Sequence, residues 1–232
     1  MANPITLITG TRKGIGKHLA EHYVNEGHIV IGCSRGDIDW QLNNYEHFML
    51  DVSDENKVKQ LFSSIRKQYG RVDNLINNAG IASMNHSLLT PASTVHKVLD
   101  TNVVGTFLFC REAAKLMKKT KYGRMVNFTT IAVPLKLEGE AAYVASKAGV
   151  KALTEVLSRE YAEYNITVNA IGPVPIETDL IRSVPKDKIQ KLLDRQTIHR
   201  LGLLEDVTNV IDFYLKAESS FITGQTLYLG GV

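Results

Sequence analysis

Several features that would assign a protein to a specialised class are missing from this sequence. Its two cysteines, Cys33 and Cys110, lie far apart and fit no metal or redox motif, so we expect free thiols in a reducing compartment. No run approaches the ~18 apolar residues that span a bilayer, and the start carries no secretion signal, so we expect a cytoplasmic protein without a membrane partner. The formal charge of +3 is too small to indicate a nucleic-acid partner. His18 and His22 share a helix face but lack a third ligand, so we expect no metal site.

What the sequence does have is a regular alternation of short apolar runs with longer amphipathic runs. The apolar runs predict buried strands at 4–9, 28–33, 47–50, 72–77, 124–129, 166–171 and 225–229. The amphipathic runs predict helices at 15–26, 54–69, 141–164 and 204–217, with two more between 91 and 119. This alternation predicts an α/β fold with a doubly wound, seven-stranded parallel sheet flanked by helices, in a single domain over 1–232.

The first strand leads into TGTRKGIG, residues 9–16, and then into a helix. Gly10 permits a tight turn, while Gly14 and Gly16 leave room for a phosphate near the backbone and for the helix to pack on the strand. The helix N-terminus adds amide hydrogens and the positive end of a dipole. Because the loop stands between a strand and a helix, it predicts a dinucleotide-binding site.

A second pattern is GEAAYVASKAG, residues 139–149, in which Tyr143 precedes Lys147 by four residues. The two side chains share one face of a helix. A phenol with an ordinary pKa near ~10 is a poor acid–base group at neutral pH, and a nearby ammonium is expected to lower that pKa. On spacing alone the pair also fits a core tyrosine and a surface lysine.

The spacing Thr-Gly-x3-Gly-Ile-Gly resembles the short-chain dehydrogenase/reductase family, and further motifs extend the resemblance along nearly the whole chain. They are NNAG (77–80), TNVVG (101–105), YxxxK (143–147), VNAIGPVPIETDL (168–180) and ITGQTLYLGG (222–231). The resemblance implies a Rossmann fold and an enzyme that interconverts a ketone and a secondary alcohol. It implies that Tyr143 is the general acid in reduction and that Lys147 tunes it and binds the nicotinamide ribose. It further implies that Asn102 holds a proton-carrying water and that Thr130 contacts the substrate oxygen.

Three positions depart from the family pattern. Thr130 stands where serine is usual; it keeps the hydroxyl but adds a methyl and a stiffer χ1. We expect its hydroxyl to face the carbonyl and the neighbouring Thr129 to face the other way. Val174 replaces the glycine of the usual PG pair, and Gly230 replaces a common aspartate. The change at Gly230 is expected to affect subunit contacts. Thr130 and the altered PG pair favour the alternative of a non-catalytic NADP-binding sensor, whereas the retained tyrosine, lysine and asparagine oppose it.

The form of the cofactor depends on the end of the second strand, where CSRG carries Arg35 and no acid for a ribose diol. With Lys13 in the glycine loop, two cations would flank a 2′-phosphate, so we expect NADP(H). Asp51 matches the position that holds the adenine amine, and the short stretch before it predicts that the usual helix is shortened or lost. The residues that the resemblance assigns to the cofactor are Gly10, Arg12, Lys13, Gly14, Ile15, Gly16, Arg35, Asp51, Val52, Asn78, Ala79, Gly80, Tyr143, Lys147, Pro173, Ile176 and Thr178.

The segment at about 175–200 is expected to be the substrate lid. Its ETDLIR resembles 3-oxoacyl-acyl-carrier-protein reductases, which implies a 3-oxoacyl thioester substrate and a carrier protein docked at Arg182 and Lys121. A free ketone, sugar or polyketide-type intermediate is the alternative, because a fold does not choose among such substrates. The resemblance also implies a homodimer through helices at 101–119 and 141–164, and often a homotetramer.

Overall fold

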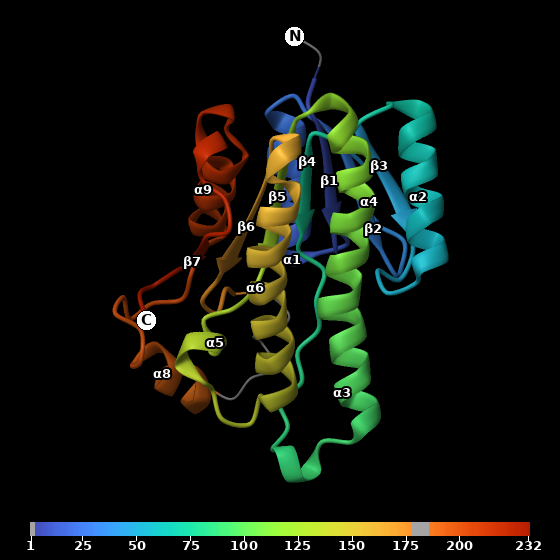
Figure 1. The fold of residues 1–232 in the computed structure, drawn as a ribbon. Helices are drawn as coiled ribbons and strands as arrows, with labels where there is room; N and C mark the ends of the chain where they lie inside the picture. Colours follow the sequence, from blue (N-terminus) through green and yellow to red (C-terminus); the bar gives the residue numbers. More distant parts are fainter. Residues whose placement is uncertain (1–2, 178–185) are drawn as a thin grey trace.

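The structure of the chain is a computed structural model that describes residues 3–177 and 186–232. It confirms the predicted sheet: seven parallel strands in the order β3-β2-β1-β4-β5-β6-β7 (Figure 1). The strands are β1 (Ile5–Thr9), β2 (Ile29–Ser34), β3 (Tyr45–Met49), β4 (Asn74–Asn77), β5 (Gly123–Phe128), β6 (Ile166–Gly172) and β7 (Thr226–Tyr228).

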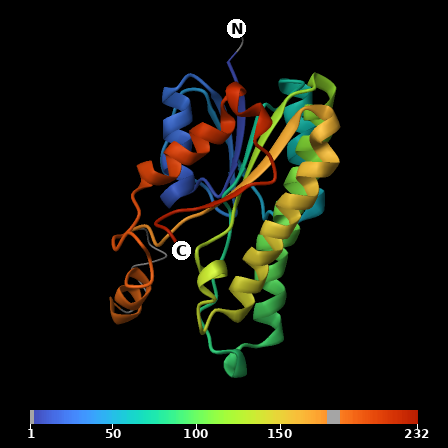
Figure 2. The same ribbon diagram turned by 60° about the vertical axis from the view of Figure 1, so that its left-hand side comes forward.

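Helices cover both faces of this sheet. They are α1 (Gly14–Asn25), α2 (Glu55–Gln68), α3 (Ala92–Leu99), α4 (Gly105–Thr120), α5 (Ala132–Leu135), α6 (Ala141–Tyr161), α8 (Lys186–Leu193) and α9 (Leu204–Leu215). One hydrophobic core packs α2, α4 and α6 against the sheet, and the other packs α1 and α9 against its opposite face (Figure 2). The fold is therefore the predicted doubly wound arrangement.

The strand order places the expected binding crevice. From β1 the chain builds the sheet outward to β2 and β3, then returns to β4 on the other side of β1. The loops after β1 and β4 therefore diverge at the carboxyl ends of adjacent strands, where such sheets bind ligands. The glycine loop follows β1 and the NNAG motif spans the end of β4, so both lie at this crevice.

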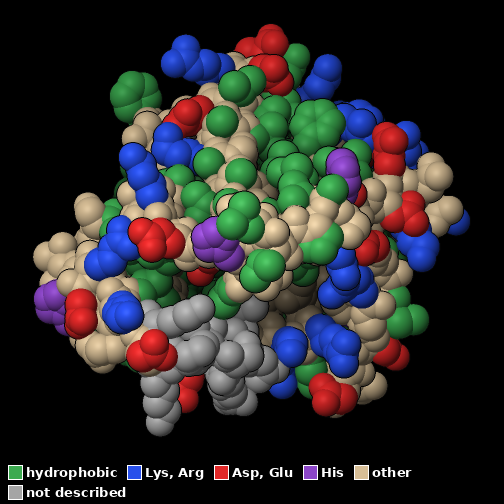
Figure 3. All heavy atoms as spheres, turned by 90° about the horizontal axis from the view of Figure 1, so that it is seen from below, with side chains coloured by type: hydrophobic (Ala, Val, Ile, Leu, Met, Phe, Trp, Pro, Cys, Tyr) green, Lys and Arg blue, Asp and Glu red, His purple; other side chains and the backbone are tan. Residues whose placement is uncertain are grey.

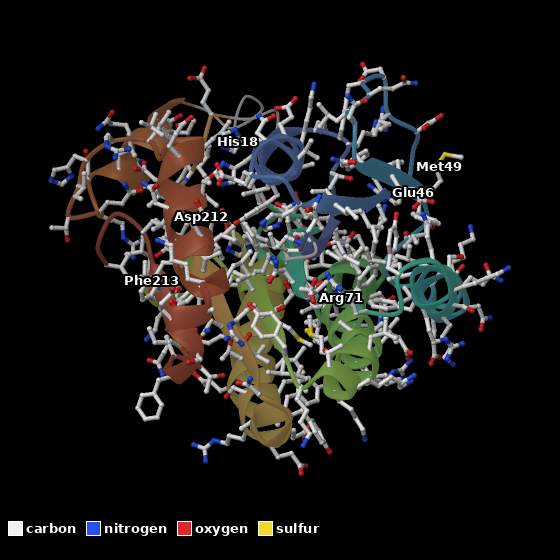
Figure 4. The ribbon with its side chains drawn as sticks, turned by 90° about the horizontal axis from the view of Figure 1, so that it is seen from above. His18, Glu46, Met49, Arg71, Asp212 and Phe213 are labelled. Carbon is white, nitrogen blue, oxygen red and sulfur yellow. The ribbon has the colours of Figure 1, made fainter. Side chains whose placement is uncertain are left out.

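The two histidines on α1 contact α9. Figure 4 looks from the amino ends of the strands, with His18 on α1 and Asp212 on α9. The imidazole of His18 lies 3.0 Å from the Thr208 hydroxyl, and that of His22 lies 3.1 Å from the Asp212 carboxylate. Among the described residues there is no group of three or more possible metal ligands, and no helix long and apolar enough to cross a bilayer.

Several local features differ from the expectations or extend them. The stretch 35–44 contains no helix, as its length predicted. A π-helical turn, Asp100–Val104, joins α3 to α4 without a break, and the short α5 and α8 were not predicted. The expected lid includes α8, but residues 178–185 lie outside the described part of the chain, and with them Thr178 and Arg182.

Candidate active site

The glycine loop is fixed against the loop that follows β4. The Asn78 side chain donates hydrogen bonds to the carbonyls of Thr9 (2.8 Å) and Gly10 (3.2 Å). A Cβ on Gly16 would lie 2.2 Å from the Gly10 carbonyl oxygen, and Gly10 itself has a φ of +77°. Only glycine fits at these two positions, because one is too close to backbone and the other has a left-handed conformation. The two loops thus form one rigid wall.

The start of α1 fits a phosphate. The helix begins at Gly14, the preceding Lys13 makes no side-chain cap, and the first turn carries no acidic residue. Its amide hydrogens and dipole therefore favour an anion. Arg12, Lys13 and Arg35 are exposed around it, and the Arg12 guanidinium reaches within 2.9 Å of where a Cβ on Gly36 would lie. Cations from the glycine loop and from the segment after β2 therefore lie near the start of α1.

Asp51 follows β3 at the same edge of the crevice. Its carboxylate accepts hydrogen bonds from the Ser53 amide (3.0 Å) and hydroxyl (2.7 Å). Burial raises the pKa of Asp51, but the Ser53 hydrogen bonds and the charges of Arg35 and Lys57 outweigh it, so the pKa lies below its usual value. Asp51 is therefore an ionised acceptor, which suits an amine donor. The adjacent Val52 is buried among the side chains of this wall.

Tyr143 on α6 meets Thr130 at the end of β5. The Thr130 hydroxyl accepts a hydrogen bond from the amide of Ala132 at 3.2 Å. Burial raises the pKa of Tyr143 to about 12; the nearby Thr130 hydroxyl opposes the rise and the Glu140 carboxylate adds to it. Thr130 therefore lies close enough to the phenol to influence its ionisation.

Lys147 lies one turn further along α6. Its ammonium is buried and donates a 2.7 Å hydrogen bond to the carbonyl of Phe128, and burial lowers its pKa to about 8. Lys147 is not among the groups that shift the pKa of Tyr143, so its expected tuning role stays a prediction. Burial disfavours the charged form of both groups, and the lysine is directed at a strand carbonyl.

Asn102, in the π-helical turn, ties three elements together. Its side-chain oxygen accepts from the amide of Ile81, and its nitrogen donates to the Ile81 carbonyl and to the Ser146 hydroxyl, each at 2.9 Å. Ser146 in turn donates to the carbonyl of Tyr143 at 2.7 Å. A Cβ on Gly80 would lie 3.2 Å from both Asn102 and the Lys147 ammonium. The expected catalytic residues are thus adjacent.

Ser146 was not singled out by the sequence patterns. A serine three residues after Tyr143 on a helix can donate back to that residue's carbonyl, so its position alone held a signal. Ala79 was expected at the crevice, and its amide donates to the Thr9 hydroxyl at 2.9 Å. Ile15 is half-buried at the start of α1, where it packs against the core beneath that helix.

In the altered loop after β6, Val174 is packed into space left by two glycines. The Pro173 carbonyl accepts from the amide of Ile131, which holds the loop beside the end of β5 (3.3 Å). The Val174 side chain is buried, and a Cβ on Gly202 or Gly230 would lie 2.6 or 2.7 Å from its methyl groups. Two departures from the family pattern, Val174 and Gly230, therefore accommodate one another. The next apolar residue, Ile176, is buried as well.

A hollow of about 230 Å³ adjoins this loop rather than the tyrosine. It is lined by Val174, Ile198, Arg200, Gly202, Asp206, Asn209, Leu229 and Gly230. Figure 3 views the molecule from the carboxyl ends of the strands, and hydrophobic side chains gather in the middle of that face. The turn Ser87–Leu89 exposes its leucines there.

Comparison with known proteins extends this picture. A family model described as enoyl-(acyl carrier protein) reductase matches residues 10–231. The chain is 32% identical to the 3-oxoacyl-[acyl-carrier-protein] reductase FabG of Salmonella typhimurium, over 98% of this chain and 96% of that protein. It is 30% identical to the ligand-free aldohexose dehydrogenase of Thermoplasma acidophilum, with a TM-score of 0.91 over 99% and 93% of the two chains.

Structures with bound cofactor are similar as well. A short-chain dehydrogenase from Leptospira borgpetersenii with bound NAD+ has a TM-score of 0.91 at 27% identity, over 99% of this chain and 92% of that one. ElxO with bound NADP has a TM-score of 0.90 at 29% identity, over 98% and 97%. Glycine loop, tyrosine, lysine and asparagine lie at the crevice in which such a cofactor binds. The chain therefore belongs to the short-chain dehydrogenase/reductase family of oxidoreductases.

Proposed function

We propose that this chain reduces a ketone to a secondary alcohol with NADPH, with Tyr143 as the general acid. The observation that carries this proposal is that Asn102 is tied to Tyr143 through Ser146, and that Asn102 and the Lys147 ammonium both lie beside Gly80. When bound, the cofactor supplies the hydride that reduces the carbonyl carbon. Tyr143 gives its proton to the carbonyl oxygen as negative charge develops there, and Thr130 donates a hydrogen bond to the same oxygen.

Two further residues support the phenol. Lys147, whose low pKa keeps it close to the point of losing its proton, would turn from the Phe128 carbonyl to a ribose hydroxyl and restore the proton on Tyr143. Asn102 fixes the backbone after β4 against α6, and its own carbonyl accepts from Thr106 at 2.7 Å. We propose that it orients the water through which protons enter.

The preference for NADP(H) rests on charge. Arg12, Lys13 and Arg35 present cations beside the start of α1, and the end of β2 carries Arg35 where an acid would bind a ribose diol. Charge-assisted hydrogen bonds from arginine and lysine favour a 2′-phosphate dianion over a ribose diol. Asp51 would accept from the adenine amine, and Pro173 and Ile176 would border the nicotinamide.

The best-supported substrate is a 3-oxoacyl thioester. The relatives named 3-oxoacyl-[acyl-carrier-protein] reductase match almost the full chain, and exposed apolar side chains at the turn Ser87–Leu89 suit an acyl chain. Lys121, exposed at the end of α4, would contact an acidic carrier protein. The similarity to an aldohexose dehydrogenase favours a sugar as the second candidate.

We also propose that the protein acts in the cytoplasm as a homodimer or homotetramer. Val104 and Phe107 at the start of α4 and Val156 on α6 are apolar and partly exposed. Pairing of these helices between two copies would cover them and add apolar burial. Light scattering that returns the mass of a single chain would contradict this assembly.

The test is NADPH oxidation, followed by absorbance, with acetoacetyl-CoA and acetoacetyl-carrier protein beside a panel of keto-sugars and small ketones. NADH is run in parallel at equal concentration. Turnover of the acyl substrates with NADPH is the expected result. Turnover of the sugars alone would support the proposed reduction chemistry and contradict the proposed 3-oxoacyl thioester substrate. Tight NADPH binding without turnover of any carbonyl would instead indicate a sensor.

A further inference from the structure

A chain of hydrogen bonds joins the glycine loop to the edge of the sheet, and no role in catalysis accounts for it. The Tyr45 hydroxyl on β3 lies 2.8 Å from the Thr11 hydroxyl and 2.8 Å from His47 Nδ1. His47 Nε2 lies 3.0 Å from the Ser34 hydroxyl and 3.2 Å from the Gly36 carbonyl. We call these five residues, Thr11, Ser34, Gly36, Tyr45 and His47, the edge network.

The chemistry of its members fixes the direction of the bonds. The Gly36 carbonyl only accepts, and Ser34 donates to it at 2.6 Å, so His47 carries its hydrogen on Nε2 and donates toward both. Nδ1 is then an acceptor, and Tyr45 donates to it while accepting from Thr11. Burial raises the pKa of Tyr45, which keeps its phenol protonated for this role. Every polar side-chain atom of the edge network has a partner.

The residues at the two ends of the edge network are next in sequence to Arg12 and Arg35. Thr11 immediately precedes Arg12, while Ser34 and Gly36 stand on either side of Arg35. The Arg12 guanidinium also lies beside Gly36, so the two cationic segments touch. Because residues 35–44 form no helix, ordinary helical hydrogen bonds do not hold this segment in place. The edge network supplies that support instead.

Two further residues show that the arrangement is built into the sequence. Gly32 on β2 has no side chain, and a Cβ there would lie 2.0 Å from the Tyr45 hydroxyl and 2.5 Å from that of Thr11. The Trp40 indole donates to the Arg12 carbonyl at 3.2 Å and packs on the Tyr45 ring, with centroids 4.6 Å apart. The glycine loop is therefore held through both a side chain and a main-chain carbonyl.

We infer that Tyr45 and His47 are positioning residues that hold Arg12 and Arg35 together at the distance a 2′-phosphate requires, and so set the preference for NADP(H). This inference rests on the proposed use of NADP(H). Neither side chain touches the cofactor in this role. Two arginines on separate segments bind one phosphate well only when their spacing is fixed beforehand, since ordering them on binding costs affinity. The edge network provides that fixed spacing.

The test uses two ligands that differ in one group, adenosine 2′,5′-bisphosphate and adenosine 5′-phosphate, titrated calorimetrically into the full-length protein. Tyr45→Phe keeps the ring and removes the hydroxyl, and Trp40→Phe removes only the indole donor. Tyr23→Phe is the matched control, because its hydroxyl donates to the Asp212 carboxylate on α9, toward the far end of α1 from the glycine loop (2.7 Å). Melting temperature and kcat at saturating NADPH are measured for each variant.

The wild type should bind the bisphosphate more tightly than the monophosphate. Tyr45→Phe should lower the affinity for the bisphosphate on the order of fivefold and leave the affinity for the monophosphate nearly unchanged. It should also leave kcat unchanged. His47→Leu should behave in the same way, and His47→Gln, which keeps a donor toward Gly36, should recover part of the loss.

Other outcomes overturn different claims. If the wild type binds both ligands equally, the proposed NADP(H) preference fails and this inference fails with it. If the wild type discriminates and Tyr45→Phe discriminates equally well, the preference stands and the positioning role is wrong. If the variants lose affinity for both ligands to the same degree, the edge network only stabilises the fold and the positioning role is wrong.

Discussion

Replacing Thr130 with valine tests whether a threonine can serve at this site. Valine is close to threonine in shape but carries a methyl in place of the hydroxyl, so the substitution removes this one polar group. That hydroxyl lies near the Tyr143 phenol, whose pKa it lowers, and accepts a hydrogen bond from the amide of Ala132. Under the proposed mechanism it also donates to the substrate oxygen as charge develops.

The expected loss follows from these contacts. One donor to a developing oxyanion contributes about 10²–10³ in kcat, which is about 2.7–4 kcal/mol. Removing the hydroxyl also removes the factor that holds the phenol pKa down, so that pKa rises further above its usual value. In alcohol oxidation, which needs the deprotonated phenol, the rate should then begin to climb only at a higher pH than in the wild type.

The assay is kcat against pH in both directions for Thr130→Val, Thr130→Ser and the wild type. Thr130→Ser keeps the hydroxyl and should stay close to wild-type activity. Thr120→Val is the matched control, because its hydroxyl donates to the Met117 carbonyl far from the site (2.9 Å). A Thr130→Val variant with wild-type kcat and an unshifted pH profile would refute this reasoning, provided that its melting temperature is also unchanged.

Three further predictions concern other residues. Glu140→Gln should lower the pKa of Tyr143, because the carboxylate raises it, and the rise of alcohol oxidation with pH should then begin at lower pH; an unmoved profile would contradict this. Gly202→Ala should cost about 1–3 kcal/mol of stability through its clash with Val174, and adding Val174→Ala should recover much of it in chemical unfolding. Arg124→Met, which removes a buried guanidinium bonded to main-chain carbonyls, should cost about 2–3 kcal/mol; a Tm within a degree of wild type would argue against that role.

The sheet and the crevice were predictable from the sequence because they depend on local patterns. Apolar runs bounded by turn residues gave all seven strands within about three residues at each end, as expected where strand edges fray. Gly10 and Gly16 were identifiable because the need for glycine is set by the backbone of the loop itself. The absent helix at 35–44 followed from the short chain length alone.

The pKa of Tyr143 could not be predicted in the same way. The tyrosine and lysine share a helix face, as their spacing indicates, but the direction of the shift depends on burial by elements distant in the sequence. The same applies to Val174, whose space is made by Gly202 and Gly230. Such compensation between positions far apart in the chain leaves no local signal.

The most direct test of the central claim is the Tyr143→Phe variant, assayed for turnover and for NADPH binding on the same preparation. Removing the phenol hydroxyl deletes the proposed general acid, so kcat for ketone reduction should fall by about 10²–10⁴. NADPH affinity should stay nearly unchanged, because the glycine loop and the cations of the crevice are untouched. A variant that reduces ketones as fast as the wild type would contradict the assignment of Tyr143 as the general acid.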